Sequence, residues 1–195
     1  MSAAPRAMNL ANQLTMARIL MALAIFPALM HPSLSSHLAA LALFTAALVT
    51  DWVDGYVARK TNTTSAFGKV ADPIADKLLI LGALIALIIH PKLDIPIWGV
   101  FLILARELIV GGMRTLAAIQ GKVLAAERWG KWKMGFQSGA VLLMLVILVL
   151  KDVPAMPGWV FHLPYHLTVL CVLATWSSGY FYFRQSRGMI EKSWA

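Results

Sequence analysis

The sequence predicts an all-α polytopic membrane protein with six transmembrane helices and an interfacial N-terminal segment. Of its 195 residues, 59% are hydrophobic and only 13% are charged, whereas about a quarter of the residues in an average soluble protein are charged. The apolar residues form runs of roughly 17 to 25, the length that crosses a bilayer. The lone cysteine excludes an intrachain disulfide and any multi-cysteine metal site. We expect one helical membrane domain over residues 1–195.

The apolar runs place the expected helices in order. Residues 1–13 are polar, and we expect a short cytoplasmic arm or an interfacial helix there. The six spans are expected at about 14–30, 36–59, 72–90, 96–120, 135–150 and 163–183. Asp72 and Pro73 are typical of an N-cap and a first helical position, so we expect the third span to begin there. The polar segments 60–67 and 121–134 are expected as a loop and a basic interfacial loop.

The basic residues predict the orientation of these spans. With six spans both termini lie on one side, and that side collects nearly all the loop cations, while the opposite loops carry only Lys92 and Lys151. The positive-inside rule then places the termini in the cytoplasm. The net charge of +8 is thereby explained by topology and contact with anionic lipids. No alternation of aromatic and basic residues indicates a nucleic-acid surface.

Four of the nine acidic residues gather in the stretch 51–76. Asp51 and Asp54 are spaced i, i+3, and Asp72 and Asp76 are spaced i, i+4, so each pair lies on one helix face. Carboxylates in otherwise apolar helices are costly, which indicates a functional site. Because four clustered carboxylates repel one another, either some are protonated or divalent cations lie among them. All-oxygen ligation suits Mg²⁺ or Mn²⁺.

Three polar residues mark the start of the first span. Asn12 and Thr15 lie at its junction with the polar arm, where either residue suits a helix cap or a contact with a ligand at the membrane surface. Arg18 lies a turn further in, and we expect its side chain to snorkel to the surface.

Charged residues also interrupt the fourth span. Arg106 and Glu107 follow ten apolar residues, and Arg114 lies two turns later. A structural ion pair is one interpretation, but two arginines and one glutamate leave a positive surplus. Acids and arginines without a convincing Ser-His-Asp or Cys-His set suit phosphoryl-group transfer, in which catalysis is mostly positioning and charge stabilisation. A site at the membrane surface favours a substrate that is half lipid and half water-soluble.

The acidic stretch resembles the signature of the CDP-alcohol phosphatidyltransferases. Eight fixed residues match over 26 positions, which are Asp51, Asp54, Gly55, Ala58, Arg59, Gly68, Asp72 and Asp76. The segments 12–18, 72–78, 106–114 and 130–133 are similar to the phosphatidylglycerophosphate synthase branch. One departure is Ala11, where that branch often has proline, and it bears on the entry of the first helix rather than on the chemistry.

The resemblance implies roles for these residues. Asp51, Asp54 and Asp72 would bind two divalent ions, and Asp76 would share in metal binding and act as the general base. The resemblance also implies two binding sites. The CDP-diacylglycerol site would be formed by Asn12, Gly55, Arg59 and Ser65. The site for the acceptor phosphate would be formed by Arg106, Arg114, Lys131 and Lys133.

The resemblance also implies a reaction and a setting. We expect a metal-dependent transfer of a phosphatidyl group from CDP-diacylglycerol to glycerol 3-phosphate, giving phosphatidylglycerol phosphate and CMP. The protein would be a homodimer among the lipids of a bacterial cytoplasmic membrane, with its site facing the cytoplasm. Inositol phosphate, or phosphatidylglycerol to make cardiolipin, stay open as acceptors. From another class, a cation transporter stays open, although a transport pathway needs polar residues spread across the bilayer.

Overall fold

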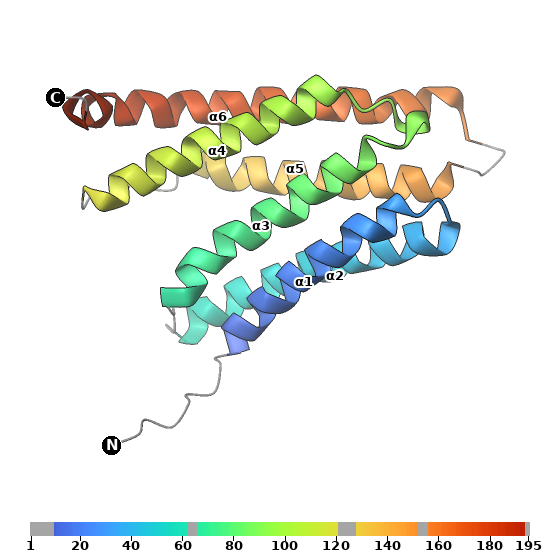
Figure 1. The fold of residues 1–195 in the computed structure, drawn as a ribbon, viewed down its shortest axis with the longest axis horizontal. Coiled ribbons are helices and arrows are strands. Elements are labelled where there is room, and N and C mark those ends of the chain that lie inside the picture. Colours follow the sequence, from blue (N-terminus) through green and yellow to red (C-terminus); the bar gives the residue numbers. More distant parts are fainter. Residues whose placement is uncertain (1–9, 62–65, 121–127, 152–155, 194–195) are drawn as a thin grey trace, which may run out of the picture. The chain divides into compact units, whose positions relative to one another are not determined.

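The computed structural model describes residues 10–61, 66–120, 128–151 and 156–193. Within these ranges the side chains of 10–11, 54–61, 66–67, 69, 128–131, 181 and 185–193 lie outside the description. The described residues form six α-helices and no strand (Figure 1). The helices are α1 (Leu10–Met30), α2 (Leu34–Thr61), α3 (Ala66–Leu87), α4 (Ile97–Ile119), α5 (Arg128–Leu150) and α6 (Leu163–Ser193). Two short 3₁₀ helices, η1 (Pro91–Leu93) and η2 (Gly158–His162), precede α4 and α6.

The all-α membrane fold is confirmed. Within the described residues, four helices are long and apolar enough to cross a membrane, and they are α1, α2, α5 and α6. Helices α3 and α4 have 22 and 23 residues, which at a rise of about 1.5 Å per residue is also enough for a bilayer. Charged residues interrupt the apolar runs of both helices, and most of these residues belong to the candidate site.

Two compact units make up the chain, Met1–Ala86 (the N-terminal unit) and Leu87–Ala195 (the C-terminal unit). The expectation of a single domain stays a prediction. In the N-terminal unit, α1 and α2 pack against each other, joined by the turn at 31–33 (Figure 1). Ser33 caps α2, because its Oγ accepts a hydrogen bond from the Ser36 N–H at 3.2 Å. Buried alanines on both helices, Ala22 and Ala40 among them, permit a close approach.

In the C-terminal unit, α6 packs against both α4 and α5. Gly99 of α4 faces Thr168 of α6 so closely that a Cβ atom at position 99 would lie 2.7 Å from the Thr168 Cγ2 atom. A larger residue at position 99 would require the Thr168 side chain or one of the two helices to shift. The two 3₁₀ helices are linked at the same end of the unit, where His162 Nδ1 lies 3.1 Å from Asp94 Oδ2. This close packing brings the charged residues of α4 against α6.

Three expected helix starts are wrong. Helix α3 begins at Ala66, so Asp72 is not its N-cap and Pro73 lies inside the helix. Helix α1 begins at Leu10, so neither Asn12 nor Thr15 caps it. Helix α5 begins at Arg128, which makes the second half of the expected interfacial loop helical. Residues 10–13 of the arm expected at 1–13 belong to α1, and its first nine residues lie outside the described residues. The centre of the loop expected at 60–67 (62–65) and the first half of the loop expected at 121–134 (121–127) also lie outside them.

Candidate active site

A buried arginine joins the acidic residues of the N-terminal unit. Arg18 of α1 is only 1% exposed, and its Nη1 atom lies 2.8 Å from Asp51 Oδ1 and 3.1 Å from Asp76 Oδ1. Asp51 comes from α2 and Asp76 from α3, so one guanidinium group ties three helices together. The expectation that Arg18 snorkels to the surface is therefore wrong. Its charge is held inside the unit because two carboxylates compensate it there.

One turn before Arg18, Thr15 reaches the third acid. Its Oγ1 atom donates a hydrogen bond of 2.6 Å to Asp72 Oδ1, and the Thr15 side chain is buried. Asn12, which is half-buried, lies a further turn back at the same i, i+3 spacing. Helix α1 therefore presents one polar face to the acidic residues of α2 and α3. The sequence pointed to the segment 12–18, which contains Asn12, Thr15 and Arg18. It did not predict that Thr15 and Arg18 contact the acidic residues of α2 and α3.

The exposure of these side chains changes across the cluster. Arg18 is enclosed, whereas the side chain of Asp76 is 24% exposed and that of Asp51 is 49% exposed. The two carboxylates are therefore partly accessible to solvent, whereas the arginine that contacts them is not. A ligand that approaches from outside meets carboxylate oxygens first.

The acidic cluster fits a cation. Two carboxylate oxygens, Asp51 Oδ1 and Asp76 Oδ1, converge on a single positively charged nitrogen, and hard divalent ions prefer oxygen donors of this kind. Among the side chains that the structure describes, no three acidic, histidine or cysteine residues form a complete metal-binding group. The fourth acid, Asp54, has its backbone in α2 and its side chain outside the description. The donors present suit a hard divalent ion, and the full ligand set stays a prediction.

Several other predicted site residues lie where the structure describes no side chain. Gly55 and Arg59 belong to α2, and Lys131 belongs to α5, but only their backbone placement is described. Ser65 lies outside the described residues. Their roles in binding the donor or the acceptor stay predictions.

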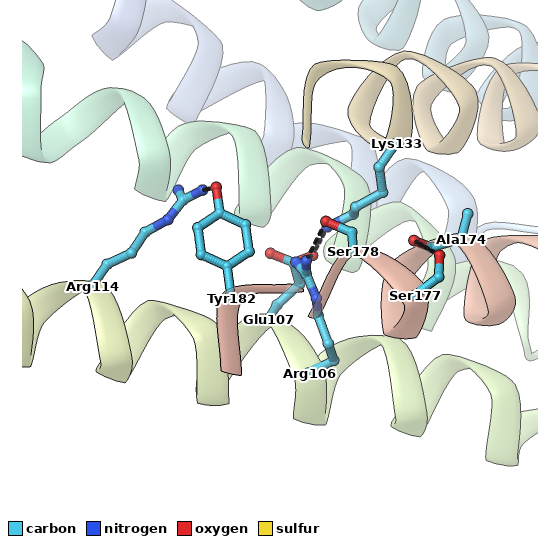
Figure 2. Close-up of polar contacts among 8 residues, drawn as sticks. All are labelled: Arg106, Glu107, Arg114, Lys133, Ala174, Ser177, Ser178 and Tyr182. Carbon is cyan, nitrogen blue, oxygen red and sulfur yellow. Dashed lines mark hydrogen bonds and ion pairs between the residues drawn. The ribbon is translucent and has the colours of Figure 1, made fainter. Parts of the chain in front are cut away.

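A second charged cluster is buried in the C-terminal unit (Figure 2). Glu107 Oε1 accepts a hydrogen bond of 3.1 Å from Arg106 Nη1 and a further one from Lys133 Nζ. Arg106 and Lys133 are 5% and 7% exposed, respectively. The structure thus brings together two predicted acceptor-site residues from different helices. Among the side chains described here, one carboxylate contacts two cations, so the positive charge is in excess by one.

Helix α6 supplies two partners that the sequence did not predict. Arg106 Nη2 donates a hydrogen bond of 2.9 Å to Ser178 Oγ, and Arg114 Nη2 donates one of 2.6 Å to Tyr182 Oη. The Arg114 Cζ atom also lies 4.9 Å from the centroid of the Tyr182 ring, within range of a cation–π contact. A serine and a tyrosine spaced i, i+4 on an apolar helix are the weak signal that points to them.

The charge of this second cluster suits an anion. Among the described side chains of this cluster, Arg106, Arg114 and Lys133 carry three positive charges and Glu107 carries one negative charge. Arginine groups of fixed orientation bind phosphate with two parallel hydrogen bonds. The charge of the cluster in the C-terminal unit therefore suits a phosphate group, and the oxygen donors of the cluster in the N-terminal unit suit a cation; binding of either stays a prediction.

Fold and clusters together define an integral membrane protein whose polar chemistry uses carboxylates, arginines and a lysine. Comparison with known proteins makes the class specific, because residues 8–170 match the family described as CDP-alcohol phosphatidyltransferase. The match covers well over half of the chain, including the acidic cluster of the N-terminal unit and α4 with its arginines. The chain belongs to the CDP-alcohol phosphatidyltransferase family.

Several similar proteins carry the name CDP-diacylglycerol–glycerol-3-phosphate 3-phosphatidyltransferase. The protein from Bacillus subtilis is 41% identical over 155 residues, which cover 71% of this chain and 77% of the relative. The protein from Rickettsia felis is 42% identical over 140 residues, covering 71% and 75%. The protein from Pseudomonas fluorescens is 36% identical over 155 residues, covering 78% and 77%.

Proposed function

We propose that this chain transfers the phosphatidyl group of CDP-diacylglycerol to sn-glycerol 3-phosphate, with release of CMP. The observation that carries the proposal is the cluster in which Arg18 joins Asp51 and Asp76, two carboxylates of the family signature. Relatives at 36 to 42% identity that are named for this reaction support it. The product, phosphatidylglycerol phosphate, keeps its acyl chains and stays in the membrane.

We assign binding of the donor, CDP-diacylglycerol, to the acidic cluster. Two divalent ions, Mg²⁺ or Mn²⁺, would be held by Asp51, Asp54, Asp72 and Asp76, and when bound they would neutralise the diphosphate and stabilise the departing CMP. Thr15 fixes one oxygen of Asp72, and Arg18 fixes one oxygen each of Asp51 and Asp76. These contacts hold the carboxylates in place before the substrate arrives. Arg59, Gly55, Asn12 and Ser65 would complete the site for the cytidine diphosphate.

Asp76 would act as the general base. The primary hydroxyl of glycerol 3-phosphate attacks the β-phosphorus, a new phosphorus–oxygen bond forms, and the bond to the CMP oxygen breaks. The hydroxyl proton passes to Asp76, whose side chain is partly exposed and thus accessible to a water-borne alcohol. Its contact with Arg18 fixes the direction in which the carboxylate faces.

The acceptor phosphate would be bound by Arg106, Arg114, Lys131 and Lys133. The support for this assignment is the surplus positive charge around Glu107, since the phosphate of glycerol 3-phosphate is a dianion near neutral pH. A neutral alcohol would leave that buried charge uncompensated, which is costly. Charge balance therefore favours a phosphorylated acceptor.

The setting of the enzyme is also part of the proposal. The excess of lysine and arginine on the side of the termini supports a cytoplasmic orientation of the site. A bacterial inner membrane accords with the bacterial sources of the relatives. We expect a homodimer.

The test is CMP release from CDP-diacylglycerol with a panel of labelled acceptors. We expect release with glycerol 3-phosphate and Mg²⁺, and little release with inositol phosphate or phosphatidylglycerol. Preference for one of those two acceptors would keep the chemistry and change the substrate. The cation-transporter alternative is not favoured, because the described carboxylates of the N-terminal unit gather around Thr15 and Arg18. Ion flux without CMP release would contradict the proposal.

A further inference from the structure

Three residues of α6 contact the arginines of α4, namely Ser178, Gly179 and Tyr182, which we call the α6 seat (Figure 2). We infer that the α6 seat positions Arg106 and Arg114 for the acceptor phosphate and thereby sets the affinity for the acceptor without touching it. The inference rests on the proposed function, and it adds residues to which neither the signature nor the charge pattern points.

Arg106 is held at both ends of its guanidinium group. Nη1 donates to Glu107 Oε1 and Nη2 donates to Ser178 Oγ. A planar group fixed at two points does not rotate freely, so its three remaining N–H groups have defined directions. One of the three, on Nε, is buried and has no hydrogen-bond partner among the described residues. A buried donor is costly when it lacks a partner, and an oxygen of a bound phosphate would remove that cost.

Gly179 provides the space in which Arg106 lies. A Cβ atom at position 179 would be 3.2 Å from Arg106 Nε and 3.4 Å from its Cγ. A larger residue would therefore require Arg106 or α6 to shift by a few tenths of an ångström, and the arginine has little freedom to yield because Glu107 and Ser178 hold its far end. The glycine allows the side chain of Arg106 to rest directly against the helix.

Tyr182 anchors the second arginine. Its hydroxyl accepts a hydrogen bond from Arg114 Nη2, and its ring lies beneath the Arg114 guanidinium. Tyr182 is buried, whereas Arg114 is exposed. A long exposed side chain would otherwise sample many rotamers, so the buried tyrosine limits the conformations open to the cation.

The ordering of the two arginines affects the affinity for the acceptor. An arginine that is already ordered loses less conformational entropy when it binds a phosphate. Removing a contact of the α6 seat therefore weakens acceptor binding, although the arginine and its charge remain. The CDP-diacylglycerol site is assigned to other residues, so its affinity should not change. A purely structural role for α6 would instead lower stability and affect both substrates.

The test compares variants of the α6 seat with matched controls on the same helix, using the full chain in detergent or nanodiscs. Ser178→Ala and Tyr182→Phe each remove one hydroxyl from the seat. Ser177→Ala removes a hydroxyl whose one partner among the described residues is the Ala174 carbonyl of the same helix. Tyr165→Phe removes a hydroxyl at the opposite end of α6 from the seat. We expect the two seat variants to raise the KM for glycerol 3-phosphate about tenfold, with the KM for CDP-diacylglycerol within about twofold. Ser178→Thr, which restores a hydroxyl, should recover most of the loss.

A second measurement keeps the test independent of turnover. Glycerol 3-phosphate should raise the thermal stability of the wild type and of both controls, and this shift should shrink in the seat variants. Seat variants that match the controls in both measurements would overturn this inference and leave the proposed function intact. An equal rise in both KM values would also overturn it, because that pattern marks a general structural role. A wild-type protein that releases no CMP with glycerol 3-phosphate would overturn the proposed function, and the inference with it.

Discussion

Substitution of Arg18 is the most direct way to perturb the acidic cluster. Replacing it with glutamine keeps a polar side chain and removes the positive charge that Asp51 and Asp76 share. The carboxylates would then repel one another with no compensating cation from α1. We expect Arg18→Gln to lower the stability of the protein when divalent ions are absent, and to lower it much less when Mg²⁺ is present.

The expected magnitude follows from the exposure of each pair. The bond to Asp76 is largely enclosed, and a charge-assisted hydrogen bond of this kind contributes about 1.5–3 kcal/mol. The pair with Asp51 is screened because half of that side chain is exposed, and such pairs contribute about 0.5–1 kcal/mol. The loss is therefore about 2–4 kcal/mol, or about 4–16 °C in Tm for a chain of this size.

The assay is thermal unfolding in nanodiscs, first with EDTA and then with saturating Mg²⁺. Arg184→Gln serves as the control, since Arg184 is exposed near the C-terminal end of α6. We expect the control to unfold at the wild-type temperature in both conditions. Arg18→Gln with wild-type stability in EDTA would refute the reasoning, and so would a deficit that Mg²⁺ leaves unchanged.

Three further substitutions test other parts of the account. Asp76→Asn should reduce turnover by a factor of about 10² or more, because the general base is lost, while CDP-diacylglycerol binding stays largely intact; wild-type-like turnover would exclude the base role. Arg106→Ala and Arg114→Ala should raise the KM for glycerol 3-phosphate more than the KM for the lipid donor, and the reverse pattern would move both arginines to the donor site. Gly99→Ala should destabilise the protein by about 1–3 kcal/mol through overpacking, because its Cβ would lie 2.7 Å from a threonine methyl of α6; Gly139→Ala, which meets nothing within 4 Å, should be neutral in the same thermal assay.

The helices could be predicted from the sequence, but some of their starts could not. Apolar runs of bilayer length indicate helices, and each of the six expected runs coincides with an α-helix in the described part of the chain, four of which qualify as membrane spans. The errors lie where polar residues extend a helix beyond its apolar run. Asp72 and Pro73 have the local chemistry of a helix start, yet α3 begins at Ala66, and Asp72 accepts a hydrogen bond from Thr15 of another helix. A tertiary contact of this kind overrides local preference and leaves no trace in the spacing of one segment.

The candidate site likewise contains residues that the sequence predicted and residues that it did not. The acids of the signature and the cations of α4 were visible, since charge in an apolar segment is conspicuous. Their partners were not, because Arg18 and Ser178 act through contacts between helices that lie far apart in the sequence. Spacing within one helix predicts which residues share a face, but it does not predict which helix lies opposite. An arginine near a helix start is equally compatible with snorkelling and with a buried ion pair.

CMP release by the purified protein tests the central claim most directly. With CDP-diacylglycerol, glycerol 3-phosphate and Mg²⁺ together, we predict stoichiometric formation of CMP and phosphatidylglycerol phosphate. Omitting the acceptor or chelating the metal should stop both products, and so should Asp76→Asn. Product formation that persists in EDTA, or in Asp76→Asn, would contradict the assignment of the acidic cluster as the catalytic centre.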